Sequence, residues 1–251
     1  MHRRRWYQRG LRSPPVQPPA DRPWVIAHRG ASAAAPENTV AAFRLAHRMG
    51  ADAVELDVRR TGDGAIVVHH DDAVGGRPLV EWMLPDLRAD HPAIPLLDEA
   101  LAACAGMWVN VEVKNSPLDT DWDPDDTALP RILESIGAAD VEISSFNPVT
   151  IGRVRQAAPH VPTGWLVDDD LMDPIDAVAA AAAAGHRAIH PDAGALAGES
   201  ARRVVTTAHD AGLWVIVWTV DDPAEMGRLA EIGIDGIITN RPDAARPAVG
   251  G

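Results

Sequence analysis

The sequence predicts an α/β protein that closes into a (β/α)8 TIM barrel, with a short inserted segment after the second strand. Short apolar stretches typical of strands alternate with helical stretches along the chain. Glycine follows the end of most helical stretches, shortly before the next strand, as expected for a left-handed helix cap. Polar and aromatic residues also gather where the expected strands end, which is where this fold carries its functional sites.

Eight strands are expected, and most of them are followed by a helix. The first and fifth follow Pro23 and Pro162, and the other six follow a helical stretch that ends in glycine. In chain order they read WVIAH at 24–28, AVELDV at 53–58, WVNVEV at 108–113, VEISS at 141–145, TGWLV at 163–167, AIH at 188–190, WVIVWTV at 214–220 and IDGIIT at 234–239. Eight such βαβ units favour a closed barrel over an open doubly wound sheet.

The helices carry recognisable start and end signals. Asp173-Pro174 and Asp222-Pro223 each offer an N-cap followed by proline at the first helical position. The stretch 177–184 is nearly all alanine, which favours helix. The expected helix ends are Met49-Gly50, Ala105-Gly106, Ile136-Gly137, Ala184-Gly185, Ala211-Gly212 and Ile232-Gly233.

The chain divides into one domain with two short extensions. We expect a disordered, basic and proline-rich arm at 1–22, a single barrel domain at 23–245 and a C-terminal tail at 246–251. The arginines of the arm leave two interpretations open, a solvated tail or contact with a membrane surface. No apolar run reaches the ~18 residues of a membrane helix, and the N-terminus lacks the apolar core of a signal peptide. The sequence therefore predicts no stable membrane insertion and a cytoplasmic protein.

Composition narrows the classes of partner. The formal net charge is −13, which argues against a nucleic-acid partner. A protein this acidic would need local positive charge or a bound cation to handle phosphate. The single cysteine, Cys104, excludes an internal disulfide framework and a cysteine-based metal site. The sequence gives no indication of the oligomeric state.

Two strands carry charged residues two positions apart. Glu55 and Asp57 share one face of the second strand, and Glu112 and Lys114 share one face of the third. If both pairs face the barrel axis, three carboxylates converge and repel one another. A divalent cation, Mg²⁺ or Ca²⁺, removes that repulsion because it takes carboxylate oxygens as ligands. The alternative is that the acids pair with arginines at the barrel rim, namely Arg29, Arg59 or Arg60.

Two adjacent histidines follow the second strand. Asp63-Gly64 is a hairpin signal, and a chain reversal about that bond places His70 opposite Asp57. His70 then joins the acids, His69 faces the other way, and Asp71 is placed to orient an imidazole.

His28 ends the first strand and reaches the same pocket, so His28 and His70 suit general acid–base catalysis around a phosphate. Arg29 and Lys114 are the candidate phosphate donors, or counter-ions of the acids, or both. The remaining histidines in helical or loop contexts are interpreted as structural, namely His47, His91, His186 and His209.

The motifs together resemble the glycerophosphodiester phosphodiesterase family. The resemblance rests on AHRGASAAAPENTVAAFRLAHRMGADAVELDVRRTGDGAIVVHHD at 27–71, IPLLDEAL at 94–101, VNVEVKN at 109–115, ISSFNP at 143–148, VWTVDD at 217–222 and GIDGIITNRPD at 233–243. It covers most of residues 24–243. The chain departs from the family's usual pattern after His70-Asp71, where the segment at about 73–93 is short, and in the extra His69.

The resemblance implies a metal-dependent hydrolysis of glycerophosphodiesters to sn-glycerol 3-phosphate and an alcohol. Carried over by motif, Glu55, Asp57 and Glu112 become metal ligands for one Mg²⁺ or Ca²⁺. His28 and His70 become the acid–base pair. Arg29 and Lys114 become phosphate contacts, and Glu37 lies at the pocket edge, where it holds the arginine or the metal environment.

Several alternatives stay open at this point. Attack by the glycerol 2-hydroxyl followed by opening of a cyclic phosphate, and direct attack by water, both fit the residues. A phospholipase-type lyase that stops at the cyclic phosphate and a catalytically silent phosphate-binding barrel are the other functions considered. Four strand-end residues are interpreted either as walls of the substrate pocket or as core packing, namely Phe146, Trp165, His190 and Trp218.

Overall fold

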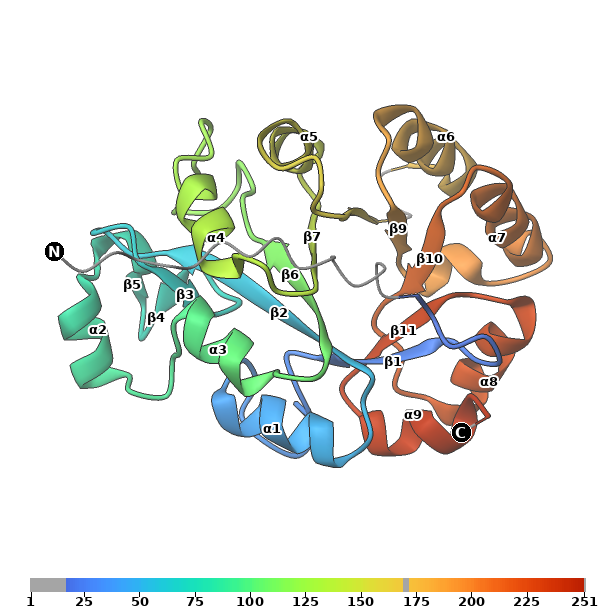
Figure 1. Cartoon of the computed structure of the whole chain (residues 1–251), viewed down its shortest axis with the longest axis horizontal. Helices are drawn as coiled ribbons and strands as arrows, with labels where there is room; N and C mark the ends of the chain where they lie inside the picture. The colour runs from blue at the N-terminus through green and yellow to red at the C-terminus, as the bar shows by residue number, and fades with distance from the viewer. Residues whose placement is uncertain (1–16, 169–171, 251) are drawn as a thin grey trace, which may run out of the picture.

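A computed structural model of the chain describes residues 17–168 and 172–250 and confirms the predicted barrel (Figure 1). The sheet follows chain order, and β1 pairs with both β11 and β2, which closes the ring. Its eight parallel strands are β1 Trp24–His28, β2 Ala53–Arg60, β6 Trp108–Val113, β7 Val141–Ser145, β8 Thr163–Val167, β9 Ala188–Pro191, β10 Trp214–Val217 and β11 Gly236–Thr239. The last two strands are shorter than expected, since β10 stops at Val217 and β11 starts at Gly236.

Helices surround the sheet, as Figure 1 shows. They are α1 Val40–Arg48, α3 Leu97–Ala103, α4 Leu129–Ile136, α5 Pro148–Ala157, α6 Pro174–Ala184, α7 Ala201–Asp210, α8 Pro223–Ile232 and α9 Pro242–Ala248, with a 3₁₀ turn η2 at Gly194–Leu196. The predicted signals are confirmed at α6 and α8. Asp173 and Asp222 accept hydrogen bonds from backbone N–H groups of the first turns, and Gly185 and Gly233 end these helices in the left-handed conformation.

The inserted segment after β2 is a small structured lobe at the left of Figure 1. It contains β3 Ile66–Val68, which pairs antiparallel with β2, then β4 Ala73–Val74, β5 Arg77–Pro78, η1 Leu79–Glu81 and α2 Leu84–Asp90. The lobe has an apolar cluster of its own, made of Val67, Val74, Leu79, Trp82 and Leu87. This separate packing explains how a short insertion holds its shape beside the barrel.

The barrel interior changes from apolar to polar along its axis. Trp24, Trp108 and Trp214 begin their strands and pack together, with ring centroids 4.8 Å apart for Trp24–Trp108 and 5.0 Å for Trp24–Trp214. Aromatic packing therefore fills the end where the strands begin. The polar side chains that the sequence places at strand ends gather at the opposite, C-terminal mouth.

Asp52, just before β2, binds one arginine near each end of the barrel domain. Arg22 Nη1 lies 2.6 Å from Asp52 Oδ2, and Arg246 Nη1 lies 3.0 Å from Asp52 Oδ1.

The predicted tail at 246–251 needs correction, because α9 continues to Ala248 and Val249 is buried. Most of the predicted arm, residues 1–16, lies outside the described residues, and the division into domains stays a prediction.

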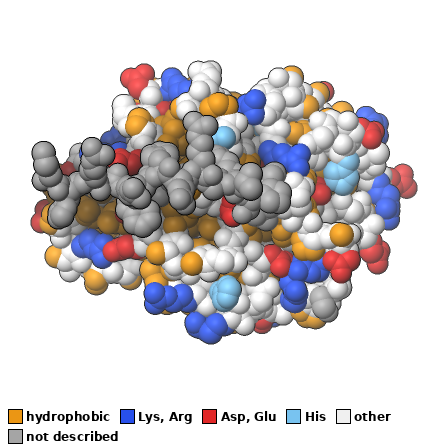
Figure 2. Space-filling view, in the orientation of Figure 1, with side chains coloured by type: hydrophobic (Ala, Val, Ile, Leu, Met, Phe, Trp, Pro, Cys, Tyr) orange, Lys and Arg blue, Asp and Glu red, His pale blue; other side chains and the backbone are white. Residues whose placement is uncertain are grey.

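Within the described ranges, none of the helices is both long and apolar enough to cross a bilayer. On the face shown in Figure 2, acidic and basic side chains are interspersed outside the grey residues. That mixture gives no sign on this face of the basic field that nucleic-acid binding needs.

Candidate active site

Three carboxylates meet at the C-terminal mouth of the barrel. Glu55 and Asp57 project from β2 and Glu112 from β6, and Asp57 and Glu112 are partners in the strand register. One oxygen of each lies within 4.8 Å of the others, and all three residues are buried. The structure thus brings together the three metal ligands that the sequence predicts.

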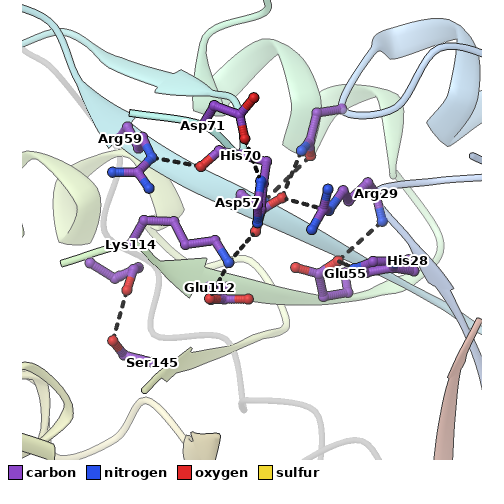
Figure 3. Close-up of polar contacts among 12 residues, drawn as sticks. His28, Arg29, Glu55, Asp57, Arg59, His70, Asp71, Glu112, Lys114 and Ser145 are labelled. Atoms are coloured by element: carbon purple, nitrogen blue, oxygen red, sulfur yellow. Dashed lines mark hydrogen bonds and ion pairs between the residues drawn. The ribbon is translucent and has the colours of Figure 1, made fainter. Parts of the chain in front are cut away.

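Two cations balance these acids. Lys114 Nζ lies 3.0 Å from Asp57 Oδ1 and 2.5 Å from Glu112 Oε1. Arg29 Nε lies 3.1 Å from Asp57 Oδ2 (Figure 3). The Nη1 of Arg29 donates to Glu37 Oε1 at 2.9 Å. Arg29 and Lys114 therefore act as counter-ions of the acids, and Glu37 holds the arginine. The five residues Glu55, Asp57, Glu112, Arg29 and Lys114 are called the mouth cluster below.

The electrostatics of the mouth cluster favour an added cation. Burial raises the pKa of Glu55 well above its ordinary value, and Asp57 and Glu112 raise it further. Burial also raises the pKa of Glu112, whereas Lys114 and Arg29 outweigh burial at Asp57 and lower its pKa. Three carboxylates against two cations leave one negative charge, and Glu55 Oε1 is buried with no hydrogen-bond partner among the described residues. An oxygen donor set of this kind fits Mg²⁺ or Ca²⁺.

His28 ends β1 and is oriented by Asn240, which directly follows the neighbouring strand β11. Its Nδ1 lies 2.7 Å from Asn240 Oδ1, and Asn240 Nδ2 donates to Asp221 Oδ2 at 2.6 Å. Because the amide nitrogen is used on Asp221, the amide oxygen faces His28, and Nδ1 carries the imidazole proton. Nε2 is then the basic nitrogen, 3.9 Å from Glu55 Oε2. Burial lowers the pKa of His28, and Arg29 lowers it further.

The predicted hairpin register is wrong by one residue. β2 and β3 pair as Val58↔Val68, so the residue opposite Asp57 is His69, whose backbone N–H donates to Asp57 O at 3.0 Å. The reversal is centred on Asp63, because three residues stand between Thr61 and Ala65, with Gly64 at φ 76°.

His70 nevertheless lines the cavity, and His69 does not. Strand β3 ends at Val68, so side-chain alternation no longer applies at these positions. His69 forms a hydrogen bond with the backbone of Ala73, and its burial lowers its pKa. His70 Nδ1 lies 2.8 Å from Asp71 Oδ1, which is the orienting contact expected from the sequence.

A cavity of about 230 Å³ opens on this site and has two unlike sides. The charged side carries His28, Arg29, Glu55, His70, Glu112 and Lys114, and the other side carries Phe146, Leu166, Trp218, Thr219 and Ile238. The Phe146 and Trp218 rings meet edge to face with centroids 5.4 Å apart. Phe146 and Trp218 are thus pocket walls, whereas Trp165 packs among the outer apolar residues and His190 is fully buried.

Three supporting residues have roles that the sequence did not predict. Asn38 Nδ2 donates to Asp57 Oδ2 at 2.7 Å, Asn240 orients His28, and Arg59 Nε donates to the backbone oxygen of His70 at 2.7 Å. Asn38 has φ 56°, a left-handed conformation that asparagine tolerates better than most residues. Their positions in the sequence could have indicated two of them, because Asn38 lies in the P-E-N-T motif and Asn240 directly follows a strand.

A second buried polar group, called the inner cluster, lies in the same barrel. It consists of Asn110, Glu142, Ser144 and His190, each at most 1% exposed. Asn110 precedes Glu112 by two positions on β6 and is the register partner of Glu142 on β7, so both lie nearer the starts of their strands than Glu112. His190 Nε2 lies 3.5 Å from Glu142 Oε1, and a Cβ on Gly164 would come within 2.5 Å of both side chains.

The sequence model of the "Glycerophosphoryl diester phosphodiesterase family" matches residues 28–244. The chain belongs to this family. A glycerophosphodiester phosphodiesterase of Caldanaerobacter subterraneus is 32% identical over 240 residues, covering 87% of this chain and 94% of that protein. The chain is accordingly an enzyme, a phosphoric diester hydrolase of the glycerophosphodiester phosphodiesterase type.

Solved structures show the same barrel. A putative glycerophosphoryl diester phosphodiesterase from Silicibacter pomeroyi matches with a TM-score of 0.78 and 26% identity, covering 92% of this chain and 94% of that one. An Oleispira antarctica phosphodiesterase in complex with the product sn-glycerol-3-phosphate matches with a TM-score of 0.76 and 25% identity, covering 90% and 96%.

Proposed function

We propose that this phosphodiesterase is metal-dependent and hydrolyses glycerophosphodiesters to sn-glycerol 3-phosphate and an alcohol by acid–base catalysis with His28 and His70. The observation that carries the proposal is the cluster of three buried carboxylates beside a cavity that both histidines line. The sn-glycerol-3-phosphate bound to the Oleispira antarctica relative supports the product.

The charged side of the cavity suits a phosphodiester anion. Glu55, Asp57 and Glu112 would hold one divalent cation, which would supply positive charge that neutralises the phosphate oxygens. Arg29 and Lys114 line the cavity beside these acids, and with the cation they give the site a net positive charge. The aromatic side, with Phe146 and Trp218, is where the organic part of the substrate packs.

The two histidines divide the proton transfers. His28 Nε2 takes the proton of the attacking hydroxyl, since its Nδ1 is occupied by Asn240 and burial lowers the pKa of the ring, which favours the neutral form. A new P–O bond forms, and the P–O bond to the alcohol breaks. His70, whose Nδ1 faces the Asp71 carboxylate, gives the departing oxygen a proton. The attacking hydroxyl belongs to water or to the glycerol 2-position.

The test is release of glycerol 3-phosphate from glycerophosphocholine and glycerophosphoethanolamine, with EDTA and with added Mg²⁺ or Ca²⁺. We expect release to stop when EDTA is added and to return when metal is added back. Release that is unchanged by EDTA would contradict the metal site. Phosphorus NMR follows the products, and a cyclic phosphate that accumulates without glycerol 3-phosphate would show a lyase instead.

The histidine roles have a separate test. A nitrophenyl ester of glycerol phosphate has a leaving group that departs without a proton. If His70 is the acid, His70→Ala should slow this substrate far less than it slows glycerophosphocholine, whereas His28→Ala should slow both alike. Equal losses for both variants on both substrates would refute the assignment.

A further inference from the structure

The segment that carries His70 has no regular structure of its own. Residues 69–72 lie between the end of β3 at Val68 and the start of β4 at Ala73. His70 is also partly exposed, so packing alone does not fix its backbone. Some other contact must hold the imidazole at the cavity, because small displacements of a reacting group lower rates steeply.

Arg59 makes that contact. It lies on β2, two residues after Asp57, and its Nε donates to His70 O at 2.7 Å (Figure 3). Its Nη1 donates to Asp121 Oδ1 at 2.6 Å, and both terminal nitrogens lie 3.1 Å from Asp119 Oδ2. The side chain is 5% exposed. A guanidinium with several donors in a rigid plane suits such a bridge.

A second hydrogen bond joins the same two segments. The backbone N–H of Thr120 donates to Asp72 Oδ2 at 2.7 Å. The loop after β6, which carries Asp119 and Asp121, thus contacts the histidine segment at two points, through Arg59 at His70 and directly at Asp72. Arg59 links this loop, the histidine segment and the strand that bears Glu55 and Asp57.

We propose that Arg59 is a positioning residue for His70: it fixes the backbone of the catalytic histidine relative to the metal-binding strand, with Asp119 and Asp121 holding the guanidinium in place. The proposal rests on the proposed acid–base role of His70. Arg59 does not line the cavity, so it acts through His70 and not on the substrate.

The test is a double-mutant cycle between Arg59 and His70. Arg59→Met is combined with Asp121→Asn so that no buried carboxylate loses its partner. We expect kcat to fall about 100-fold, with KM and the Mg²⁺ concentration for half-activity changed by less than about threefold. In the His70→Ala background the same change should cost less than about threefold, because the residue that Arg59 positions is gone.

Arg60→Met is the matched control. Arg60 is the next residue on β2, its Nε lies 3.6 Å from Asp123 Oδ2, and the described residues show no hydrogen bond from it to 69–72. Its kcat should stay within about twofold of the parent. If the Arg59 variant fails to fold, Asp119→Asn with Asp121→Asn tests the same bridge from its other end. That variant should lower kcat about tenfold, and again not in the His70→Ala background.

Unchanged kcat in both bridge variants, or losses that multiply with His70→Ala, would overturn the positioning role. An active His70→Ala enzyme would overturn the proposed acid–base role instead, so the two failures are distinguishable.

Discussion

The mouth cluster and the inner cluster are two groups of buried polar side chains in one barrel. They differ in how the charge of their acids is balanced and in whether they open on the cavity. In the mouth cluster, Asp57 contacts Arg29 and Lys114, Glu112 contacts Lys114, and the cluster opens on the cavity. In the inner cluster, Glu142 faces one imidazole, that of His190, and both side chains are fully buried. Burial of an acid therefore does not by itself mark a site; excess charge beside an open cavity does.

The largest expected effect separates the two clusters by activity. Glu112→Gln should lower kcat/KM by at least about a thousandfold, because several kcal/mol of cation-dependent stabilisation are lost. Glu142→Gln, the same change in the inner cluster, should keep kcat/KM within about threefold. Both are measured by glycerol 3-phosphate release at saturating Mg²⁺. Comparable losses in the two variants would remove the distinction between the clusters.

The next effect concerns the two adjacent histidines. His70→Ala should lower kcat by about 10²–10⁴-fold, the usual contribution of a general acid or base. His69→Ala should lower it by less than about threefold, because the His69 ring bonds to the backbone of Ala73 outside the cavity. Steady-state kinetics on glycerophosphocholine compare the two, and thermal unfolding checks that both variants fold. A larger loss for His69→Ala would contradict the placement seen here.

A third effect should appear in stability and not in chemistry. His190→Leu leaves Glu142 buried without its partner and should lower the free energy of unfolding by roughly 3 kcal/mol. Replacing both residues by leucine should recover most of that loss, because a buried pair can often be exchanged for apolar side chains of similar size. Urea unfolding measures the cycle. If the double variant is as unstable as His190→Leu, the inner cluster is held by more than this pair.

The smallest effect tests the aromatic side of the cavity. Trp218→Phe removes part of the wall and the hydrogen bond from Nε1 to His190 O, so KM should rise about two- to fivefold. Trp165→Phe, on the outer side of β8, should leave KM unchanged. The comparison uses KM for glycerophosphocholine, and equal KM values in the two variants would argue against Trp218 as a substrate contact.

The sequence predicted the barrel and most of the mouth cluster for local reasons. Alternation along a strand put Glu55 beside Asp57, and glycine caps marked where strands begin. The hairpin register failed, because a three-residue turn and a two-residue turn give the same Asp-Gly signal but differ by one position. The placement of His70 depends on chain that has left the ladder, which no periodicity describes.

Supporting residues were missed where contacts cross large separations in the chain. Asn240 reaches His28 only because the barrel closes, and Arg59 meets Asp119 and Asp121 across two neighbouring strands. The inner cluster was also unforeseen, since Glu142 on an apolar strand gave no signal without knowledge of which face is inward.

Asp52 has a consequence for engineering. Arg22 and Arg246 meet at this acid, before β2 and on the end of the barrel opposite the cavity. A domain, tag or surface linker fused before Arg22 or after Arg246 would start from the end of the barrel that the tryptophans fill. Joining the two ends by a short peptide and reopening the ring at an outer loop would likewise leave substrate access unobstructed.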